Sequence, residues 1–349
     1  MVFRMTRLSD LAAAGFDSVI DVRAPSEFAE DHVPGAINLP VLTDEERAHV
    51  GTIYVQEDSF LARKIGAALV ARNAAAHIEG PLADREGGWR PLVYCWRGGQ
   101  RSGSFASILG QIGWRVETLD GGYRSYRRLV VRRLYEEDLP TRLILLDGLT
   151  GTAKTEVLLA LRGEGVQILD LEGLANHRGS ALGGRGDQPS QKAFESALAE
   201  GIDGLDPARP VVVEAESSKV GRLNLPPRLF AAMKTAPRIE ITASVAARSD
   251  YLTRAYADLV TDGRALDERL ERLVRLQGRA QVDEWKALAA EAKHRDLAQD
   301  LIERHYDPRY RKVRQRAEGN RVAVIEAAAL TAKDIRALAC QIAERISGM

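Results

Sequence analysis

The sequence predicts an α/β protein of two domains, and three observations support this. Its 349 residues exceed the usual size of a single domain. A strand followed by a glycine-containing loop and a helix occurs in each half of the chain, and this order is typical of α/β units. Hydrophobic residues make up 45% of the chain and charged residues 28%, a balance that indicates a globular protein rather than a disordered one.

The first half contains short apolar runs that predict buried strands, and the second of them ends directly at Cys95. A run of acidic residues and a proline follow at 136–140, so we place a domain boundary there and expect a first domain at residues 1–138. The predicted elements are strands at residues 19–22 and 92–94, a helix at 102–112, a closing segment at 119–122 and a basic helix at 123–135.

The second half, residues 139–349, repeats the α/β order and then becomes helical and heavily charged. The spacing of apolar residues predicts an amphipathic helix at the end of the chain. The predicted elements are strands at 143–147, 168–171, 211–214 and 322–325, and helices from 156–161, over about 264–316 and at 331–346.

Charge and cysteine content narrow the function classes. The chain has 49 basic and 49 acidic residues, so any nucleic-acid site has to be a local basic patch. Two cysteines provide no disulfide framework and suit a reducing compartment. Residues 1–10 contain no apolar signal core, and no apolar run is long enough to span a bilayer. We therefore expect a cytoplasmic protein without a membrane partner.

The loop at residues 95–101, Cys-Trp-Arg-Gly-Gly-Gln-Arg, is the candidate catalytic loop. Cysteine reacts as the thiolate, which positive surroundings stabilise. Arg97, Arg101, curled backbone N–H groups and the start of the next helix would provide such surroundings for Cys95 or for a persulfide or perselenide built on it. The alternative is that Cys95 is a small buried apolar residue. We assign that structural role to Cys340, on the apolar side of the last helix.

The loop at residues 148–155, Gly-Leu-Thr-Gly-Thr-Ala-Lys-Thr, nearly matches the phosphate-binding pattern G-x-x-x-x-G-K-[ST]. Gly148 and Gly151 would let backbone N–H groups surround phosphate oxygens. Lys154 would contact a terminal phosphate, and the Thr155 hydroxyl could bind Mg²⁺. Ala153 replaces a glycine, and we expect it to have helix-like dihedral angles, since a positive φ would be unfavourable for alanine.

Further polar residues are expected near this phosphate loop. Glu214 ends a predicted strand and is the candidate Mg²⁺ ligand, although Glu216 satisfies the pattern equally and both could be solvated strand-end residues. The loop at 176–186 contains four glycines and three basic residues, a composition that suits an anion site but also a flexible surface loop. From this region we assign Arg178 and Arg185 to phosphate binding, and Asn176, His177 and Lys192 could add donors.

The first half resembles a rhodanese domain. The resemblance covers about 130 residues and rests on residues 21–23, 27–28 and 32–40, on the cysteine loop and on residues 119–123. It implies a rhodanese-like fold with Cys95 at the active position. We expect Asp21 and Arg23 to form a structural ion pair, and His32 to be structural as well.

The combination of this domain with a P-loop NTPase-like domain resembles the bacterial tRNA 2-selenouridine synthases. Residues 95–99, 176–180, 188–195 and 214–221 carry the resemblance. It implies a transferase that alkylates wobble 2-thiouridine with geranyl diphosphate and then replaces the S-geranyl group with selenium from selenophosphate. No tightly bound cofactor is implied, and the enzyme that supplies selenophosphate becomes a candidate partner. Two alternatives remain: an ATP-dependent tRNA sulfurtransferase, and a nucleotide-dependent regulator whose first domain only binds a partner.

Two basic stretches with interleaved tyrosines are candidates for tRNA contact, because RNA binding combines cationic and planar groups. The stretch at 123–133 has apolar residues that suggest a core-facing or domain-joining helix. We therefore assign RNA binding to the stretch at 305–316, although either could be a solvated helix face. The assigned residues are Arg309, Arg311, Lys312 and Arg314.

Overall fold

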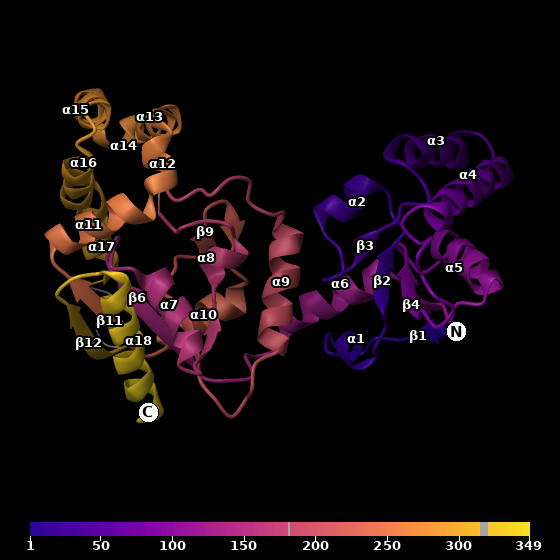
Figure 1. Cartoon of the computed structure of the whole chain (residues 1–349), viewed down its shortest axis with the longest axis horizontal. Helices are drawn as coiled ribbons and strands as arrows, with labels where there is room; N and C mark the ends of the chain where they lie inside the picture. Colours follow the sequence, from indigo (N-terminus) through magenta and orange to yellow (C-terminus); the bar gives the residue numbers. More distant parts are fainter. Residues whose placement is uncertain (181, 315–319) are drawn as a thin grey trace. The chain divides into compact units, whose positions relative to one another are not determined.

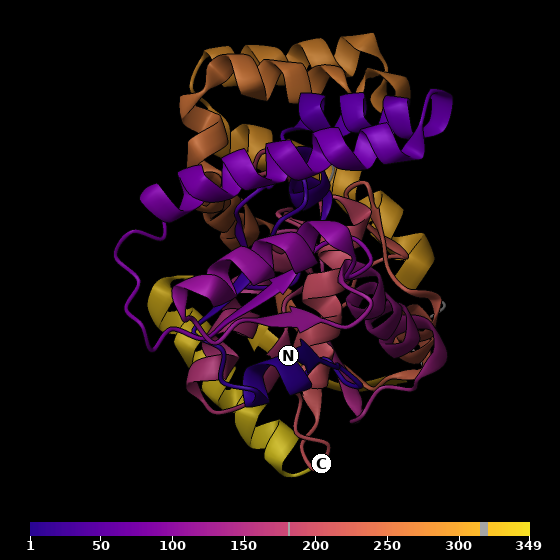
Figure 2. The ribbon, with the colours of Figure 1, turned by 90° about the vertical axis from the view of Figure 1, so that its right-hand side faces the viewer.

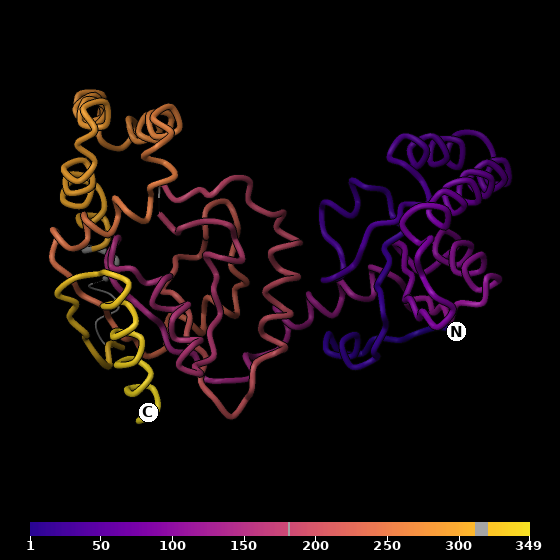
Figure 3. Tube along the Cα trace, in the orientation of Figure 1, coloured from indigo at the N-terminus to yellow at the C-terminus, as the bar shows by residue number. Residues whose placement is uncertain are grey.

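The computed structural model of the protein describes residues 1–180, 182–314 and 320–349, with the backbone alone for residues 311–314. The chain divides into two compact units (Figures 1 and 3). The first unit is Met1–Asp138 together with Pro189–Gly204, and the second is Leu139–Gln188 together with Leu205–Met349. Residues 189–204, which the sequence placed in the second domain, therefore belong to the first unit.

The first unit is built on a parallel five-stranded sheet in the order β1-β5-β4-β2-β3. From β2 the chain continues to β3 at one edge of the sheet, and from β4 it continues to β5 on the opposite side. The carboxyl ends of β2 and β4 therefore border the crevice where ligands bind in such sheets. Its elements are β1 Val2–Phe3, α1 Asp10–Ala13, β2 Ser18–Asp21, α2 Pro25–Glu30, β3 Ile37–Asn38, α3 Asp44–Gln56, α4 Ser59–Glu79, β4 Pro91–Tyr94, α5 Gln100–Ile112, β5 Glu117–Leu119, α6 Tyr123–Val131, the π-helical turn η1 Arg132–Glu136 and α9 Gln191–Asp203.

The core of the first unit lies between this sheet and its helices. All four residues of β4 are buried, as expected for a parallel strand covered on both faces. Ile20, Val93, Phe105 and Leu109 belong to one buried cluster. Helices α3 and α4 are in contact and run side by side (Figure 2).

Helix α9 belongs to the first unit because it packs against α6. The carboxylate of Glu195 accepts hydrogen bonds from Arg127 of α6 and from the Tyr135 hydroxyl of η1. The Ser196 hydroxyl donates to the buried carboxylate of Asp31 at 2.9 Å. These bonds join residues that are at least 60 positions apart, so local sequence patterns do not reveal them.

The second unit contains a parallel sheet in the order β12-β11-β6-β8-β7. Its elements are β6 Leu143–Gly148, α7 Lys154–Gly163, β7 Gln167–Leu169, α8 Leu171–Leu174, β8 Val211–Glu214, β9 Lys219–Val220, β10 Leu223–Asn224, α10 Pro227–Thr235, β11 Arg238–Ala243, α11 Val245–Ala255, α12 Ala257–Thr261, α13 Gly263–Glu271, α14 Val274–Gln277, α15 Arg279–Ala290, α16 His294–Leu301, η2 Ile302–Tyr306, α17 Asp307–Arg314, β12 Arg321–Ala327 and α18 Ala332–Ser347.

Two separate apolar clusters stabilise the second unit. The first lies between the sheet and helices α7 and α18, which pack against each other (Figure 1). The second lies inside the helical segment α12–α16 and is centred on the fully buried Trp285. Over residues 264–314, the charged stretch expected at about 264–316 is therefore a set of short helices, most of which share a core of their own. No helix in the described ranges is long and apolar enough to cross a membrane.

Candidate functional site

The cysteine loop of the first unit lies directly after β4, at the carboxyl edge of the sheet where β4 pairs with β2. Cys95 is only 4% exposed. Its thiol sulfur accepts a hydrogen bond from the Ser102 hydroxyl at 3.2 Å. Helix α5 begins at Gln100, so the loop and the first turn of this helix enclose the sulfur.

The pKa of the Cys95 thiol is lowered. Burial acts to raise it, but the Ser102 hydroxyl and the backbone N–H groups of Ser102, Gly99 and Arg97 stabilise the thiolate and outweigh burial. The loop backbone therefore contributes to the stabilisation of the thiolate. Sequence reasoning missed Ser102, which was detectable only as a hydroxyl in the first turn of the helix after the loop.

Glycines allow the cysteine loop to pack closely against the turn that starts α6. A side chain on Gly122 would lie 2.2 Å from the Cys95 carbonyl oxygen, and one on Gly98 would lie 2.7 Å from the Leu119 carbonyl oxygen. Both glycines also have positive φ angles, of 58° and 67°. The backbone N–H of Tyr123 donates to the Cys95 carbonyl at 2.9 Å, so the first turn of α6 is fixed to the loop.

The two arginines of the loop have different surroundings. Arg101 forms an ion pair with Glu27 at 2.8 Å, and Glu27 also pairs with Arg47 at 3.0 Å. Burial acts to raise the pKa of Glu27, but Arg101 and Arg47 lower it overall. Arg97 is exposed, and its backbone N–H contributes to the stabilisation of the thiolate.

The residues assigned to structural roles in the first unit have such roles. Asp21 and Arg23 form a buried ion pair at 2.6 Å, and Arg23 also donates to the Asp31 carbonyl oxygen at 2.6 Å. His32 stacks on Phe28 with ring centroids 3.8 Å apart. These contacts order the segment between β2 and β3.

The phosphate loop of the second unit joins β6 to α7. A side chain on Gly148 would lie 2.4 Å from the Thr152 hydroxyl and 2.8 Å from the Ile241 carbonyl oxygen, so glycine is required there. Gly151 has a φ of 85°. Ala153 has a φ of 58° and a ψ of 27°, and our expectation of helix-like angles was wrong. An alanine in the left-handed conformation is less favourable than one in the right-handed conformation by about 1–2 kcal/mol. Ala153 has this conformation at the position directly before α7.

Lys154 and Thr155 point their polar atoms into this loop region. The Lys154 ammonium donates to the Gly148 carbonyl oxygen at 2.9 Å, so it lies at the position from which it could exchange that oxygen for a phosphate. The Thr155 hydroxyl donates to the Glu172 carboxylate at 2.6 Å. Glu172 at the start of α8 was missed by sequence reasoning, since nothing local marks it.

The acidic residues near Thr155 differ from the expected arrangement. Glu214 is fully buried and accepts from the Leu171 backbone N–H at 3.1 Å, and it does not line the pocket above the loop, whereas Glu172 and Glu216 do. Glu172 and Glu216 therefore replace Glu214 as the acids that could face a cation. Burial and the neighbouring Glu172 raise the pKa of Glu216 to about 8.

The described residues contain no group of three or more His, Cys, Asp or Glu arranged to hold a metal ion. A bound cation beside Thr155 would therefore need oxygen ligands from a phosphate as well, which is how Mg²⁺ commonly binds. Burial and the neighbouring Glu172 carboxylate both raise the pKa of Glu216, and a cation beside the two carboxylates would offset their mutual repulsion.

The pocket above the phosphate loop, called here the phosphate pocket, is also lined by Arg178 and Arg185. Arg178 pairs with Asp258 at 2.8 Å and lies over the Tyr256 ring at 4.6 Å. One terminal nitrogen of Arg178 is buried and has no hydrogen-bond partner among the described residues. An anion in the pocket would provide that partner.

The remaining donors proposed for this anion site are used elsewhere. The Asn176 amide donates to the Asp187 carbonyl oxygen at 3.0 Å, and His177 accepts from the Gly179 backbone N–H at 3.0 Å. Lys192 lies on α9 in the first unit and pairs with Glu30 at 2.7 Å. Lys192 is thus paired within the first unit and does not line the pocket above the phosphate loop.

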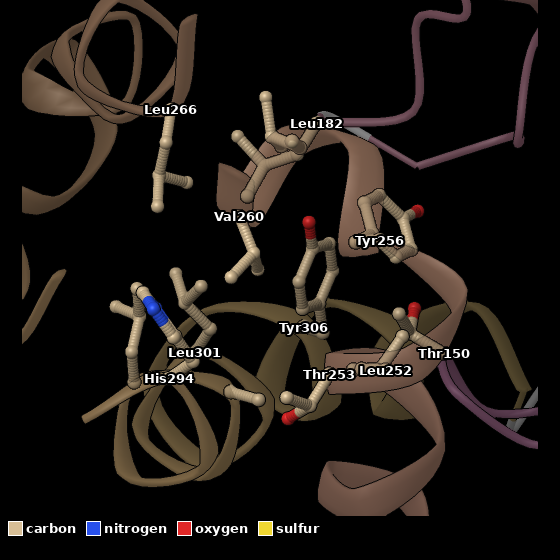
Figure 4. A pocket seen from close by; sticks show the side chains of 13 residues that line it. Thr150, Leu182, Leu252, Thr253, Tyr256, Val260, Leu266, His294, Leu301 and Tyr306 are labelled. Carbon is tan, nitrogen blue, oxygen red and sulfur yellow. The ribbon is translucent and has the colours of Figure 1, made fainter. Parts of the chain in front are cut away.

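A second pocket in this unit, called here the apolar pocket, shares Thr150, Leu252 and Tyr256 with the phosphate pocket. Figure 4 shows side chains from several helices converging on it. Sequence reasoning missed this pocket because its residues come from distant segments. Its apolar lining includes Leu182, Leu259, Val260, Leu266, Leu297, Leu301 and Tyr306.

Two further assignments concern the C-terminal part of the chain. Arg309 is exposed on α17, whereas the side chains of Arg311, Lys312 and Arg314 lie outside the described residues. Cys340 is exposed, so our prediction of a core cysteine was wrong. It lies near Glu164, which raises its pKa, while α18 buries Leu338, Ala339 and Ile342 instead.

Comparison with known proteins identifies both parts of the chain. Residues 5–129 match the rhodanese-like domain family, and residues 141–334 match the AAA domain of tRNA 2-selenouridine synthase. A tRNA 2-selenouridine synthase from Hahella chejuensis is 36% identical, with 86% of each chain covered. One from Pseudomonas syringae pv. syringae is 34% identical, covering 84% of this chain and 87% of its own. The chain therefore belongs to the tRNA 2-selenouridine synthase family.

Proposed function

We propose that this chain converts wobble 2-thiouridine in tRNA into 2-selenouridine, in two steps that use geranyl diphosphate and selenophosphate. Relatives that match most of the chain are named tRNA 2-selenouridine synthase, which supports the product of this conversion. The two steps need different chemistry, and the two units offer different sites. The second unit has features that suit a diphosphate with an apolar chain, and the first has features that suit a selenium anion.

The shared lining of the phosphate pocket and the apolar pocket carries the proposal for the first step. Thr150, Leu252 and Tyr256 line both pockets, so a ligand with an anionic head and an apolar tail can occupy the two together. The phosphate loop, Lys154 and the unpartnered nitrogen of Arg178 would hold the diphosphate. The leucines and Tyr306 would remove the geranyl chain from water.

In the first step the sulfur of 2-thiouridine attacks C1 of geranyl diphosphate. A C–S bond forms, the C1–O bond breaks, diphosphate leaves and the base loses its N3 proton. Contacts that stabilise negative charge on the departing diphosphate accelerate such a step. Lys154 and Arg178 are the residues of this chain that we assign to that role, and Mg²⁺ bound beside Thr155, Glu172 and Glu216 would add to it.

In the second step selenium of selenophosphate attacks C2 of the base. The geranyl thiolate leaves and takes up a proton, and water then cleaves the Se–P bond to release phosphate. Alkylation matters because it turns a poor leaving group into a good one. Cys95 would orient selenophosphate for this attack, and the Ser102 hydroxyl and loop N–H groups that stabilise its thiolate would stabilise a selenium anion for the same reason.

The tRNA would contact the basic stretch at Arg309, Arg311, Lys312 and Arg314, and the exposure of Arg309 is compatible with this. The reaction fits the cytoplasm, where tRNA and a reducing environment are present. The enzyme that supplies selenophosphate is the candidate protein partner.

Narrowing the apolar pocket tests the first step. Val260 lies in this pocket (Figure 4), and Val260→Phe should weaken geranyl diphosphate binding while leaving inorganic diphosphate binding unchanged, as measured by calorimetry. Val55→Phe at an 82% exposed position is the matched control. Wild-type affinity of Val260→Phe for geranyl diphosphate would exclude this pocket as the prenyl site.

A further inference from the structure

A groove in the first unit, called here the Trp96 groove, lies beside the cysteine loop and has a strongly basic lining. The chain carries no net charge, so a concentration of cations at one place is informative about a partner. One acidic residue, Glu136, also lines the groove. The groove is further lined by Trp96, by apolar side chains of α6 and by the basic residues Arg124, Arg127, Arg128, Arg132 and Lys192.

The position of this groove relative to Cys95 is fixed by backbone hydrogen bonds. Trp96 follows the cysteine directly, and the N–H groups of Tyr123 and Arg124 donate to the carbonyl oxygens of Cys95 and Trp96 at 2.9 and 3.1 Å. The first turn of α6 is therefore attached to the reactive loop. A ligand held along α6 would lie next to the site that we assign to selenium transfer.

Two of the arginines are available to a ligand. Arg124 and Arg128 are exposed, and neither forms an ion pair with a carboxylate in the described part of the chain. Within residues 1–180, 182–314 and 320–349, the Arg128 guanidinium hydrogen-bonds only to the Arg124 carbonyl oxygen, at 3.3 Å. By contrast, Arg127, Arg132 and Lys192 pair with Glu195, Glu137 and Glu30.

The spacing of the cations favours a polyanion over a single phosphate. Arg124, Arg128 and Arg132 are four residues apart and follow one side of the helical segment. A rise of about 1.5 Å per residue separates neighbours by about 6 Å and the outer two by about 12 Å. Such a line is longer than one phosphate group and suits consecutive phosphates of a nucleic-acid strand.

Trp96 adds a planar surface to this line of charges. It is half-buried and lines the groove, whereas Trp89, Trp114 and Trp285 are at most 8% exposed. Tyr123 lies against it with ring centroids 5.3 Å apart. Bases of single-stranded RNA stack on such aromatic side chains while their phosphates bind neighbouring cations.

We infer that the Trp96 groove binds single-stranded RNA, with Arg124 and Arg128 on consecutive phosphates and a base stacked against Trp96. The inference rests on the proposed action on tRNA, but it concerns binding and is independent of either chemical step. It adds a contact in the first unit to the one proposed at residues 309–314. The stacked nucleotide lies beside Cys95, where the selenium step needs it.

Binding of the full chain to 2-thiouridine-containing tRNA, measured against salt concentration, tests this site. Arg124→Gln with Arg128→Gln should lower the magnitude of the salt slope by about 1.4, since each single-strand phosphate contact contributes about 0.7. The matched control is Lys64→Gln with Arg72→Gln, which removes two exposed charges from α4. An equal loss of slope in the control, or no loss in the groove variant, would overturn the inference.

Tryptophan emission tests the stacking separately. The tRNA should quench wild-type emission, and Trp96→Phe should abolish most of that quenching and weaken binding by about tenfold. Inorganic phosphate and selenophosphate are the comparison ligands. Quenching by either of them without quenching by tRNA would mean that the groove binds a small anion and that the RNA assignment is wrong. Neither measurement depends on product formation. Failure of the proposed reaction can therefore be distinguished from failure of RNA binding at the Trp96 groove.

Discussion

Removing the Ser102 hydroxyl should make Cys95 a weaker nucleophile near neutral pH. This hydroxyl is the strongest of the groups that lower the pKa of the thiol, and it donates to the sulfur at 3.2 Å. A hydrogen bond to a charged group contributes about 1.5 kcal/mol or more, and about 1.4 kcal/mol corresponds to a factor of ten. Ser102→Ala should therefore reduce the thiolate fraction, and with it the rate of alkylation, about tenfold.

The assay is alkylation by iodoacetamide as a function of pH, with each cysteine followed by peptide mass spectrometry. Loss of the hydroxyl raises the pKa of Cys95, so the rate profile should move to higher pH and rejoin that of the wild type once both thiols are ionised. Cys340 is exposed and remote in sequence, so its profile is the internal control. Ser104→Ala, at an exposed position on the same helix, is the matched variant. An unchanged Cys95 profile in Ser102→Ala would refute the assigned role of this hydroxyl.

Four further outcomes are expected. Lys154→Ala should weaken geranyl diphosphate binding about tenfold to a hundredfold in calorimetry, and exposed Lys333→Ala should not. Cys95→Ser should accumulate S-geranyl-2-thiouridine in nucleoside digests, whereas a normal selenouridine yield would remove Cys95 from the selenium step. Ala153→Gly should raise the free energy of unfolding by up to about 1 kcal/mol in urea titrations, because glycine accepts the positive φ. The folded protein retains the Glu216 proton up to a pKa of about 8, so stability should fall from about pH 4.5 to 8, and Glu216→Gln should flatten that slope.

Local sequence patterns predicted the two reactive loops because each loop follows an apolar strand and contains within itself the residues that identify it. The cysteine with its glycines and the near-complete phosphate pattern need no distant partner to be recognised. The strand at Val211–Glu214 was predicted with the observed bounds, because three consecutive valines strongly favour a β-strand.

The remaining features depend on contacts between distant residues. Helix α9 joins the first unit through Glu195 and Ser196, and no local pattern distinguishes it from other helices of the second half. Glu172 faces Thr155 only because α8 follows β7. The left-handed angle of Ala153 was misjudged because Ala153 is the N-cap residue directly before α7, and an N-cap residue has non-helical dihedral angles.

The pockets show the same dependence on distant contacts. The apolar pocket combines Leu182 with residues of α11, α12, α13, α16 and η2, and periodicity within any one helix indicates only that its leucines are buried. The Trp96 groove forms because glycines let the α6 turn approach the cysteine loop. From the sequence, α6 was expected to face the core or to join the domains. One side of α6 is indeed buried, with Tyr126, Leu129 and Val130, but its other side is exposed and lines the groove.

The most direct test of the proposed function is the identity of the nucleosides produced. The protein is incubated with 2-thiouridine-containing tRNA, geranyl diphosphate and selenophosphate, the tRNA is digested, and the nucleosides are identified by mass spectrometry. Omitting selenophosphate should leave S-geranyl-2-thiouridine, and the complete mixture should yield 2-selenouridine. Unmodified 2-thiouridine in the complete mixture, or 2-selenouridine formed equally well without geranyl diphosphate, would contradict the two-step account.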